Sequence, residues 1–188
     1  LEGIGDYAFE ACSGLTSITL PSSLTYIGEG TFSSCSGLIE IDLSNCTNLT
    51  SIGGAAFGSC PNLEELDLSN CTNLTSIGYM AFGYCIGLDS IILPSSLKNI
   101  GEYAFQDCTS LTKVDLSNCI SLEGIGDYAF EACSGLTSIT LPSSLTSIGS
   151  LAFRYCTSLT ELDLSNCTNL TSIGSQVFSG CSGLTSIT

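Results

Sequence analysis

Eight phenylalanines occupy the same position of a recurring unit, and no phenylalanine occurs anywhere else in the chain. Each lies five residues after the Ile of an Ile-Gly pair or its counterpart and three residues before a cysteine. Successive members are 23 or 25 residues apart, a period typical of stacked coils that each repeat one supersecondary element. We therefore expect the rings to stack as the spine of a continuous coil, in the order Phe9, Phe32, Phe57, Phe82, Phe105, Phe130, Phe153 and Phe178.

Two versions of the unit alternate irregularly, a shorter one exemplified by residues 136–158 and a longer one by residues 63–87. Seven full units cover residues 15–183, and a partial unit flanks them at each end. Residues 1–25 and 122–146 are identical, which suggests an array that grew by copying. We treat 1–188 as a single solenoid domain. Because it opens and closes inside units, without a charged and apolar leader, we expect it to be part of a longer array.

Each unit combines three local patterns. The segment Leu-x-x-Leu-x-Leu alternates apolar and polar residues, which predicts a half-buried strand; stacked at about 4.8 Å per coil, such strands form a parallel sheet. A second short apolar stretch ends in Ile-Gly, where we expect the glycine to adopt a backbone conformation that a side chain would forbid. The segment Ala-Phe-x-x-Cys predicts a single helical turn, capped by the residue three positions before the Phe: Asp6, Glu29, Glu102, Asp127, Ser150 or Ser175.

The combined motif L-x-x-I-x-L-P-x-x-L-x-x-I-G-x-x-A-F-x-x-C resembles the BspA-like, or Treponema pallidum type, leucine-rich repeat over the whole chain. The longer units are also similar to the cysteine-containing leucine-rich repeat, as in Cys60-x-x-Leu63-x-x-Leu66-x-Leu68-x-x-Cys71. The resemblance implies an α/β solenoid: a right-handed coil with a parallel strand sheet on one face, and short strands plus single helical turns on the other. It also implies an extracellular or cell-surface location and an adhesion-type binding or structural role, with no catalytic residues to carry over.

Charge restricts the partners. The chain has 18 acidic residues against three basic ones and a net charge of −15. Such a surface repels phosphate backbones and anionic lipid, so nucleic-acid and membrane-surface binding are disfavoured. No apolar run approaches the roughly 18 residues of a membrane span, so we expect no membrane insertion. The absence of His removes the commonest general base, metal ligand and pH switch, and we expect no cofactor and no enzyme.

Twelve cysteines fall at two positions of the unit, eight after the Phe and four in Ser-Asn-Cys turns. Without a Cys-x-x-Cys or a His, a zinc site is a poor interpretation. Equivalent cysteines of adjacent coils are close enough for disulfides, but their side chains point in parallel. We favour free, buried thiols that act as small apolar ladder residues.

Charged residues on the outward side of the predicted strands are the sharpest candidate site. Glu40 and Asp42 precede Glu65 and Asp67 on the next strand, where like charges about 5 Å apart repel. A cation or a basic partner would relieve this repulsion, although a flat ladder would bind calcium with a Kd of only about a millimolar. Solvated surface charge is the alternative. Further partner-binding candidates on this side are Ile92, Lys113, Asp115, Glu161 and Asp163.

Other surface residues carry less information. Tyr26, Tyr79, Tyr84, Tyr103 and Tyr155 lie on or beside the predicted helical turns, and they suit either an interface or ordinary packing along the coil edge. Six Asn-x-Ser/Thr sequons are candidate glycosylation sites of a eukaryotic secreted protein, although duplication alone explains their number: Asn45, Asn48, Asn70, Asn73, Asn166 and Asn169.

The leading functional hypothesis is a non-enzymatic scaffold whose strand side engages a protein or glycan partner, since a solenoid repeats contacts along its axis. The alternative is a structural subunit of a long or self-stacking filament, in which copies associate end to end. An enzyme is the weakest interpretation, because the chain offers no nucleophile–base pair and a filled coil leaves no pocket.

Overall fold

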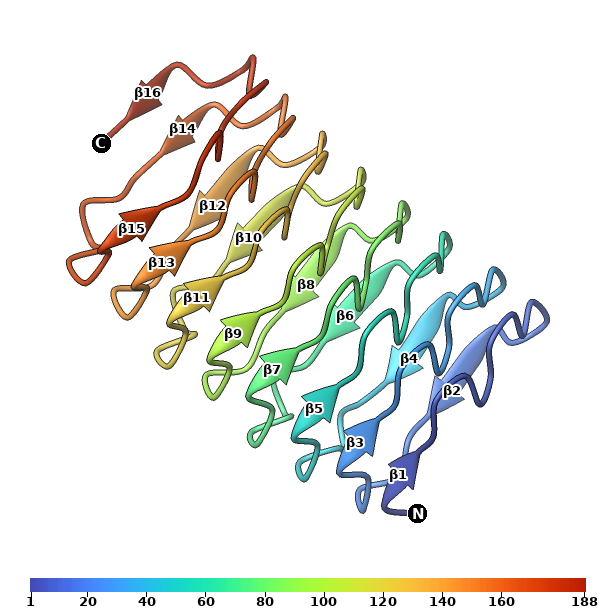
Figure 1. The fold of residues 1–188 in the computed structure, drawn as a ribbon. Coiled ribbons are helices and arrows are strands. Elements are labelled where there is room, and N and C mark those ends of the chain that lie inside the picture. Colours follow the sequence, from blue (N-terminus) through green and yellow to red (C-terminus); the bar gives the residue numbers. More distant parts are fainter.

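The computed structural model describes residues 1–188 as a parallel β-solenoid. Successive coils follow one another along a single axis, and the two termini lie at opposite ends of it (Figure 1). Every regular element is a short strand, and no helix is present. There is accordingly no helix of the length and apolar character that crossing a membrane requires.

The short strands that end in Ile form one continuous sheet, which we call the back sheet. All eight odd-numbered strands pair in parallel in chain order, with Ile27 opposite Ile52 and Ile52 opposite Ile77. The Ile side chains of β1 to β13 are buried, so each of these strands contributes one apolar residue to the core, whereas Ile173 of β15 in the last coil is 49% exposed. The strands are β1 (Gly3–Ile4), β3 (Tyr26–Ile27), β5 (Ser51–Ile52), β7 (Ser76–Ile77), β9 (Asn99–Ile100), β11 (Gly124–Ile125), β13 (Ser147–Ile148) and β15 (Ser172–Ile173).

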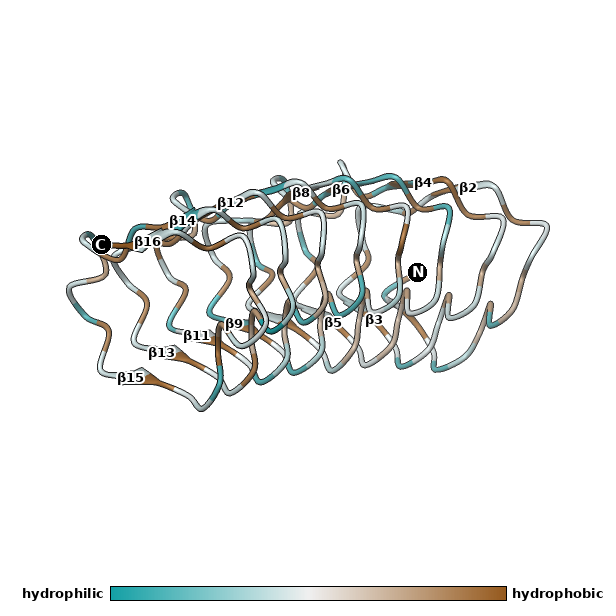
Figure 2. Cartoon of the chain, turned by 90° about the horizontal axis from the view of Figure 1, so that it is seen from above, coloured by the Kyte–Doolittle hydropathy of each residue, from teal (hydrophilic) through white to brown (hydrophobic).

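The Leu-x-Leu segments form the opposite side, which we call the front face. Its even-numbered strands are parallel, as predicted, but they divide into sheets of two, four and two strands, with breaks between β4 and β6 and between β12 and β14. They are β2 (Ser17–Thr19), β4 (Glu40–Asp42), β6 (Glu65–Asp67), β8 (Ser90–Ile92), β10 (Lys113–Asp115), β12 (Ser138–Thr140), β14 (Glu161–Leu162) and β16 (Ser186–Ile187). The view in Figure 2 shows the coils as loops with the front strands along one side and the back strands along the other.

The phenylalanines stack as predicted. Neighbouring ring centroids are 5.2 to 5.7 Å apart and the ring planes differ by at most 10°. The six inner rings are fully buried, whereas Phe9 at the first coil is 38% exposed. Each inner ring is therefore covered by the coils before and after it, and the core is continuous along the axis.

The predicted helical turn is wrong. In the five residues centred on each Phe, which we call the Phe turn, the first and last residues have positive φ, as Tyr103 (57°) and Asp107 (56°) do around Phe105. The N–H groups of these three residues donate to the next coil, at 2.8 to 2.9 Å. Those of Ala104 and Gln106 instead close local turns onto carbonyls three residues back. Positive φ at both ends of the turn is incompatible with a right-handed helix, and bonds between coils take the place of helical bonds.

The bonds between Phe turns all run in one direction. In the first coil the N–H groups of Tyr7, Phe9 and Ala11 donate to carbonyls of the second coil, at 2.7 to 2.8 Å. The same three positions donate forward in every later coil that has a successor. These bonds offset the positive φ of thirteen of the fourteen non-glycine residues that adopt it, a conformation that costs roughly 1–2 kcal/mol each in isolation.

Three of the six residues predicted to cap a helical turn instead accept a hydrogen bond from the next coil. The Oδ1 atom of Asp6 accepts the N–H of Glu29 at 2.8 Å, and Oδ1 of Asp127 accepts the N–H of Ser150 at 2.6 Å. Ser150 in turn accepts the N–H of Ser175 through its hydroxyl, at 3.2 Å. These side chains therefore tie one coil to the next and do not cap their own turn.

The role predicted for the glycine of the Ile-Gly pair is wrong as well. The φ angle of none of these glycines is positive. A Cβ atom at Gly101 would lie 2.6 Å from the carbonyl oxygen of Ile77 and 2.8 Å from the backbone of Gly78. Close approach of two coil backbones, and not backbone conformation, requires glycine at this position.

Candidate functional site

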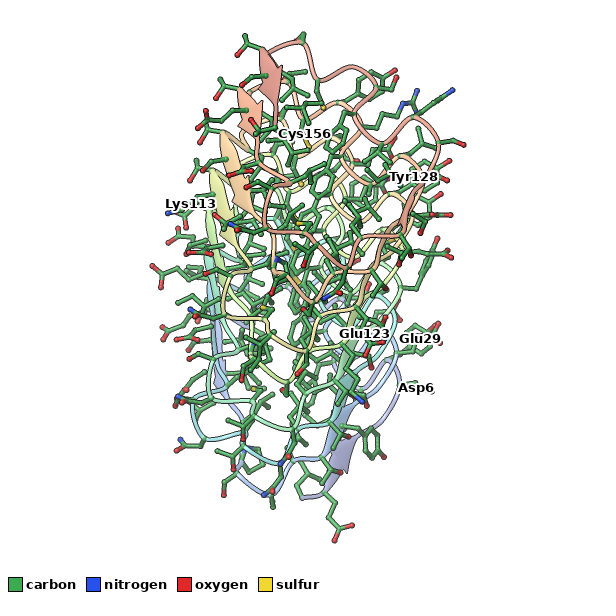
Figure 3. The ribbon with its side chains drawn as sticks, turned by 90° about the vertical axis from the view of Figure 1, so that its left-hand side faces the viewer. Asp6, Glu29, Lys113, Glu123, Tyr128 and Cys156 are labelled. Carbon is green, nitrogen blue, oxygen red and sulfur yellow. The ribbon has the colours of Figure 1, made fainter.

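The front face presents two rows of outward side chains that run along the axis. Ladder pairing places Glu65, Ser90, Lys113 and Ser138 side by side in the first row. The second row places Asp67 beside Ile92, and Asp115 beside Thr140. The charged candidates are therefore mostly separated by Ser, Thr or Ile. Figure 3 shows Lys113 pointing outward from this side of the molecule.

Within these two rows, acidic residues of adjacent strands face each other only where β4 lies beside β6. Glu40, Asp42, Ser44, Glu65 and Asp67 line a depression there, at one of the two breaks in the front strands. A second depression lies at the other break, and its polar lining is Ser138, Thr140, Glu161, Asp163, Asn166, Ser186 and Thr188. That second break has no facing acidic pair, so repulsion is not the common cause of the breaks.

The four aspartates of this set have a structural role that the sequence did not reveal. Oδ1 of each accepts the N–H of the Ser two residues later, at 2.8 to 3.0 Å, which closes an Asx turn at the end of the strand. The hydroxyl of Ser44 makes the larger contribution, and its backbone N–H the smaller one, to a pKa of Asp42 that lies below the usual value. Hydrogen bonds from Ser117 and Ser165 likewise lower the pKa of Asp115 and of Asp163.

The glutamates differ, because the side chains of Glu40, Glu65 and Glu161 are exposed and make no hydrogen bond or ion pair within the chain. The side chain of Ile92 is 52% exposed and lies beside Asp67. No group of three or more carboxylates or thiols is arranged to hold a metal ion, which gives no support to the cation considered for Glu40, Asp42, Glu65 and Asp67. The groups free to meet a partner are thus the glutamates, Lys113 and Ile92.

The six sequon asparagines are all exposed, but they fall into two classes. The Nδ2 groups of Asn48, Asn73 and Asn169 donate to a carbonyl of the preceding coil, at 2.9 to 3.0 Å. Asn45, Asn70 and Asn166 make no such bond. A glycan on the first class would attach to a nitrogen that contacts the preceding coil, whereas one on the second class would not.

The cysteines are buried, as expected, except for Cys12 in the first coil. From the second coil onward, the thiol after each Phe donates to the carbonyl of the preceding coil's Phe, with Sγ–O distances of 3.0 to 3.3 Å. Burial raises the pKa of Cys60 from its usual 9.0 to about 12. Burial likewise raises the pKa of Cys108 well above the usual value. The thiols of Cys60 and Cys108 therefore stay protonated, and their hydrogen bonds join adjacent coils.

A polar cluster on the outer surface of the Phe turns escaped the sequence reasoning. Glu131, only 8% exposed, accepts from Arg154 at 3.2 Å in the one ion pair of the chain, and from Gln106 Nε2 at 2.9 Å. The guanidinium of Arg154 also lies over the ring of Tyr155, 4.4 Å from its centroid. All three cluster members directly follow a Phe in successive coils, so an alignment of equivalent positions could have found them.

Tyr128 was also missed. Its ring stacks on that of Tyr103 with centroids 4.5 Å apart and planes 6° apart. In Figure 3 it points away from the side that carries Lys113, and Cys156 lies in the interior between them. The tyrosines of the Phe turns are therefore remote from the front face.

These features define a class of protein: a parallel β-solenoid scaffold whose repeated geometry serves stacking and whose outward residues differ from coil to coil. Within that class, the chain belongs to the BspA type leucine-rich repeat family, because the model of that six-copy repeat region matches residues 1–112 and again residues 75–188. A search of curated proteins finds no match.

Two solved structures agree with this assignment. A leucine-rich repeat protein of T. pallidum is 29% identical, with a TM-score of 0.75, over 98% of this chain and 72% of that one. The pneumococcal vaccine antigen PcpA is also 29% identical, with a TM-score of 0.60, over 100% of this chain and 53% of that one. The chain thus spans about half the length of the PcpA structure.

Proposed function

We propose that the protein is a non-enzymatic repeat scaffold, exposed at the cell surface or in the extracellular space, whose front face binds a protein or glycan partner. Family membership supports a scaffold, and the likeness to a pneumococcal antigen supports surface exposure. The observation that carries the binding role is the set of outward glutamates that make no bond within the chain, above all Glu40 and Glu65 beside the depression between β4 and β6.

The chemistry of this face favours a partner with donors or positive charge. Two adjacent glutamates repel each other, and a basic side chain or a row of sugar hydroxyls placed between them would relieve that repulsion. Lys113, Asp115, Ile92 and the pair Glu161 and Asp163 extend the same face along the axis, so an elongated ligand could contact several coils. The aspartates would contribute through Oδ2, because their Oδ1 atoms are engaged in Asx turns.

The test compares the wild type with a Glu40→Ser/Glu65→Ser variant. Serine fits this position, since Ser17 and Ser90 occupy it in other coils. Surface plasmon resonance against a panel of extracellular matrix proteins and glycans should show at least about tenfold weaker binding of any ligand by the variant, equivalent to about 1.4 kcal/mol.

Asp67→Asn is the matched control. Asparagine keeps the acceptor of the Asx turn, so this variant removes only the negative charge of the aspartate. Equal affinity of the wild type and the Glu40→Ser/Glu65→Ser variant for every ligand that binds would remove the acidic row from the proposal. Labelling of intact cells with an antibody to the chain tests the location separately. A signal that appears only after permeabilisation would contradict surface exposure.

A second candidate function is end-to-end assembly. Phe9 is 38% exposed although its counterparts in inner coils are fully buried, and Ile187 at the other end is 55% exposed. Either a further coil or a second copy can cover these ends. Electron microscopy of the purified 188-residue chain should show particles that lengthen with protein concentration, and particles of constant length would exclude this role.

A further inference from the structure

A second surface, distinct from the front face, gathers most of the aromatic side chains that are not in the core. Four of the seven tyrosines and the single arginine lie on the Phe turns of four consecutive coils, and Tyr79 directly precedes the first of these turns. We call this set the tyrosine surface: Tyr79, Tyr84, Tyr103, Tyr128 and Tyr155, with Arg154. Tyr79, Tyr84 and Tyr155 are 43 to 52% exposed. Tyrosine and arginine are the residues most enriched where proteins bind one another.

The tyrosine surface is held in place by contacts within the chain. Tyr79 meets Tyr103 edge-on with centroids 5.5 Å apart, and Tyr103 stacks on Tyr128 at 4.5 Å. Arg154 is fixed by the buried Glu131 and donates to the hydroxyl of Tyr155 at 2.9 Å. Because these side chains are already ordered, a partner would lose little conformational entropy in ordering them.

The charge of the surroundings selects a basic partner. Glu102 is exposed, and Asp127 and Asp107 are half-buried beside the tyrosines. Arg154 does not offset these carboxylates, since its charge is already paired with Glu131. A guanidinium group suits such a surface, because it forms bidentate bonds with carboxylates and lies against aromatic rings, as Arg154 does on Tyr155.

The geometry favours a protein segment over a sugar. The facing sides of Tyr103 and Tyr128 are packed on each other, so no open ring face remains between them for a sugar to stack on. The surface runs along the axis over four coils of about 4.8 Å each, which matches about five residues of extended chain. We infer that the tyrosine surface docks an extended, arginine-rich segment of a protein partner, at a site separate from the front face.

Other coils of the chain show which substitutions the fold accepts at these positions. Ala55 occupies the position of Tyr103 and Tyr128 in another coil, with the same positive φ. The Tyr103→Ala/Tyr128→Ala variant should therefore fold, which thermal unfolding monitored by circular dichroism checks. Its net charge equals that of the wild type, so a loss of binding cannot come from weaker overall attraction.

The probe is a fluorescein-labelled peptide of alternating arginine and serine, titrated with the 188-residue protein at about 150 mM salt to limit diffuse attraction. Fluorescence anisotropy should show binding to the wild type and at least about tenfold weaker binding to Tyr103→Ala/Tyr128→Ala. Tyr7→Ala, at the same position of the first coil, should change the affinity less than about twofold, a difference near the limit of such measurements.

Three results would overturn the inference. In the first, the double tyrosine variant binds the peptide as tightly as the wild type. In the second, the affinity falls in the Glu40→Ser/Glu65→Ser variant and not in the tyrosine variant, which would place the peptide on the front face in agreement with the proposed function. In the third, a neutral oligosaccharide binds and the tyrosine variant abolishes that binding, which would make the surface a sugar site.

Discussion

At the scale of single residues, contact with the preceding coil restricts which residue type a position of the unit can hold. Gly53, Gly78 and Gly101 each lie so close to the preceding coil that a Cβ atom would approach its backbone within 2.6 to 2.7 Å. Gly5 occupies the same position in the first coil, and nothing lies within 4 Å of a Cβ there. The chain thus contains its own comparison between a glycine that stacking requires and one that it does not.

We predict that Gly101→Ala lowers the free energy of unfolding by about 1–3 kcal/mol, because the methyl group would force two coils apart. Gly5→Ala should leave the stability unchanged or raise it by up to about 1 kcal/mol, since alanine reduces the entropy of the unfolded chain. Urea denaturation of both variants measures the difference. Equal losses for the two would mean that local backbone conformation, and not coil contact, selects glycine.

At the scale of elements, the Phe turn joins three ladders: stacked rings, forward N–H bonds and thiols bonded to Phe carbonyls. The thiol ladder carries a pH dependence. In the unfolded chain the cysteines titrate near 9.0, whereas burial raises the pKa of Cys60 in this ladder, and that of Cys71 in a Ser-Asn-Cys turn, to about 12. The folded protein therefore holds these protons more tightly, so the stability they contribute is complete below about pH 9 and falls as the pH rises toward 12.

We predict that the free energy of unfolding decreases between pH 9 and 11 with a slope that reports several protons, each adding about 1.4 kcal/mol per pH unit. Cys60→Ala removes one such group and should flatten the slope by about one proton. Denaturant titrations in this pH range provide the measurement. A slope identical in the variant and the wild type would show that Cys60 is not part of the effect.

The ladder positions could be predicted from spacing alone, because a period of 23 or 25 residues brings equivalent residues together whatever the local conformation. The conformation between them could not. Ala104 and Phe105 look helical in isolation, and only the acceptors of the neighbouring coil draw alternate N–H groups out of the turn. Asp42 and Glu40 likewise look equivalent in sequence, but only Asp42 is followed at the right distance by a serine that it can bind.

At the scale of the whole molecule, charge is the least balanced quantity. The net charge is −15, and the single ion pair joins Arg154 and Glu131. The remaining carboxylates are spread along one compact rod, so their mutual repulsion opposes folding more than it opposes an expanded chain.

We predict that the melting temperature rises as NaCl is increased from about 10 mM to 1 M, because the screening length falls from roughly 30 Å to 3 Å. The increase should be smaller for Glu40→Ser/Glu65→Ser, which removes two neighbouring charges. Differential scanning calorimetry provides the measurement. A melting temperature that does not change with salt would show that the acidic surface is electrostatically neutral toward folding.

The forward hydrogen bonds of the Phe turns make the two ends of the rod chemically different, because every N–H of this ladder points toward the last coil. At its start, the carbonyls of Asp6, Ala8 and Glu10 have no N–H partner, and at its end the N–H groups of Gln176, Phe178 and Gly180 have no acceptor. A capping segment designed for the first coil must supply hydrogen-bond donors, and one designed for the last coil must supply acceptors. Two rods can consequently join only with the last coil of one against the first coil of the next, never with two first coils or two last coils in contact.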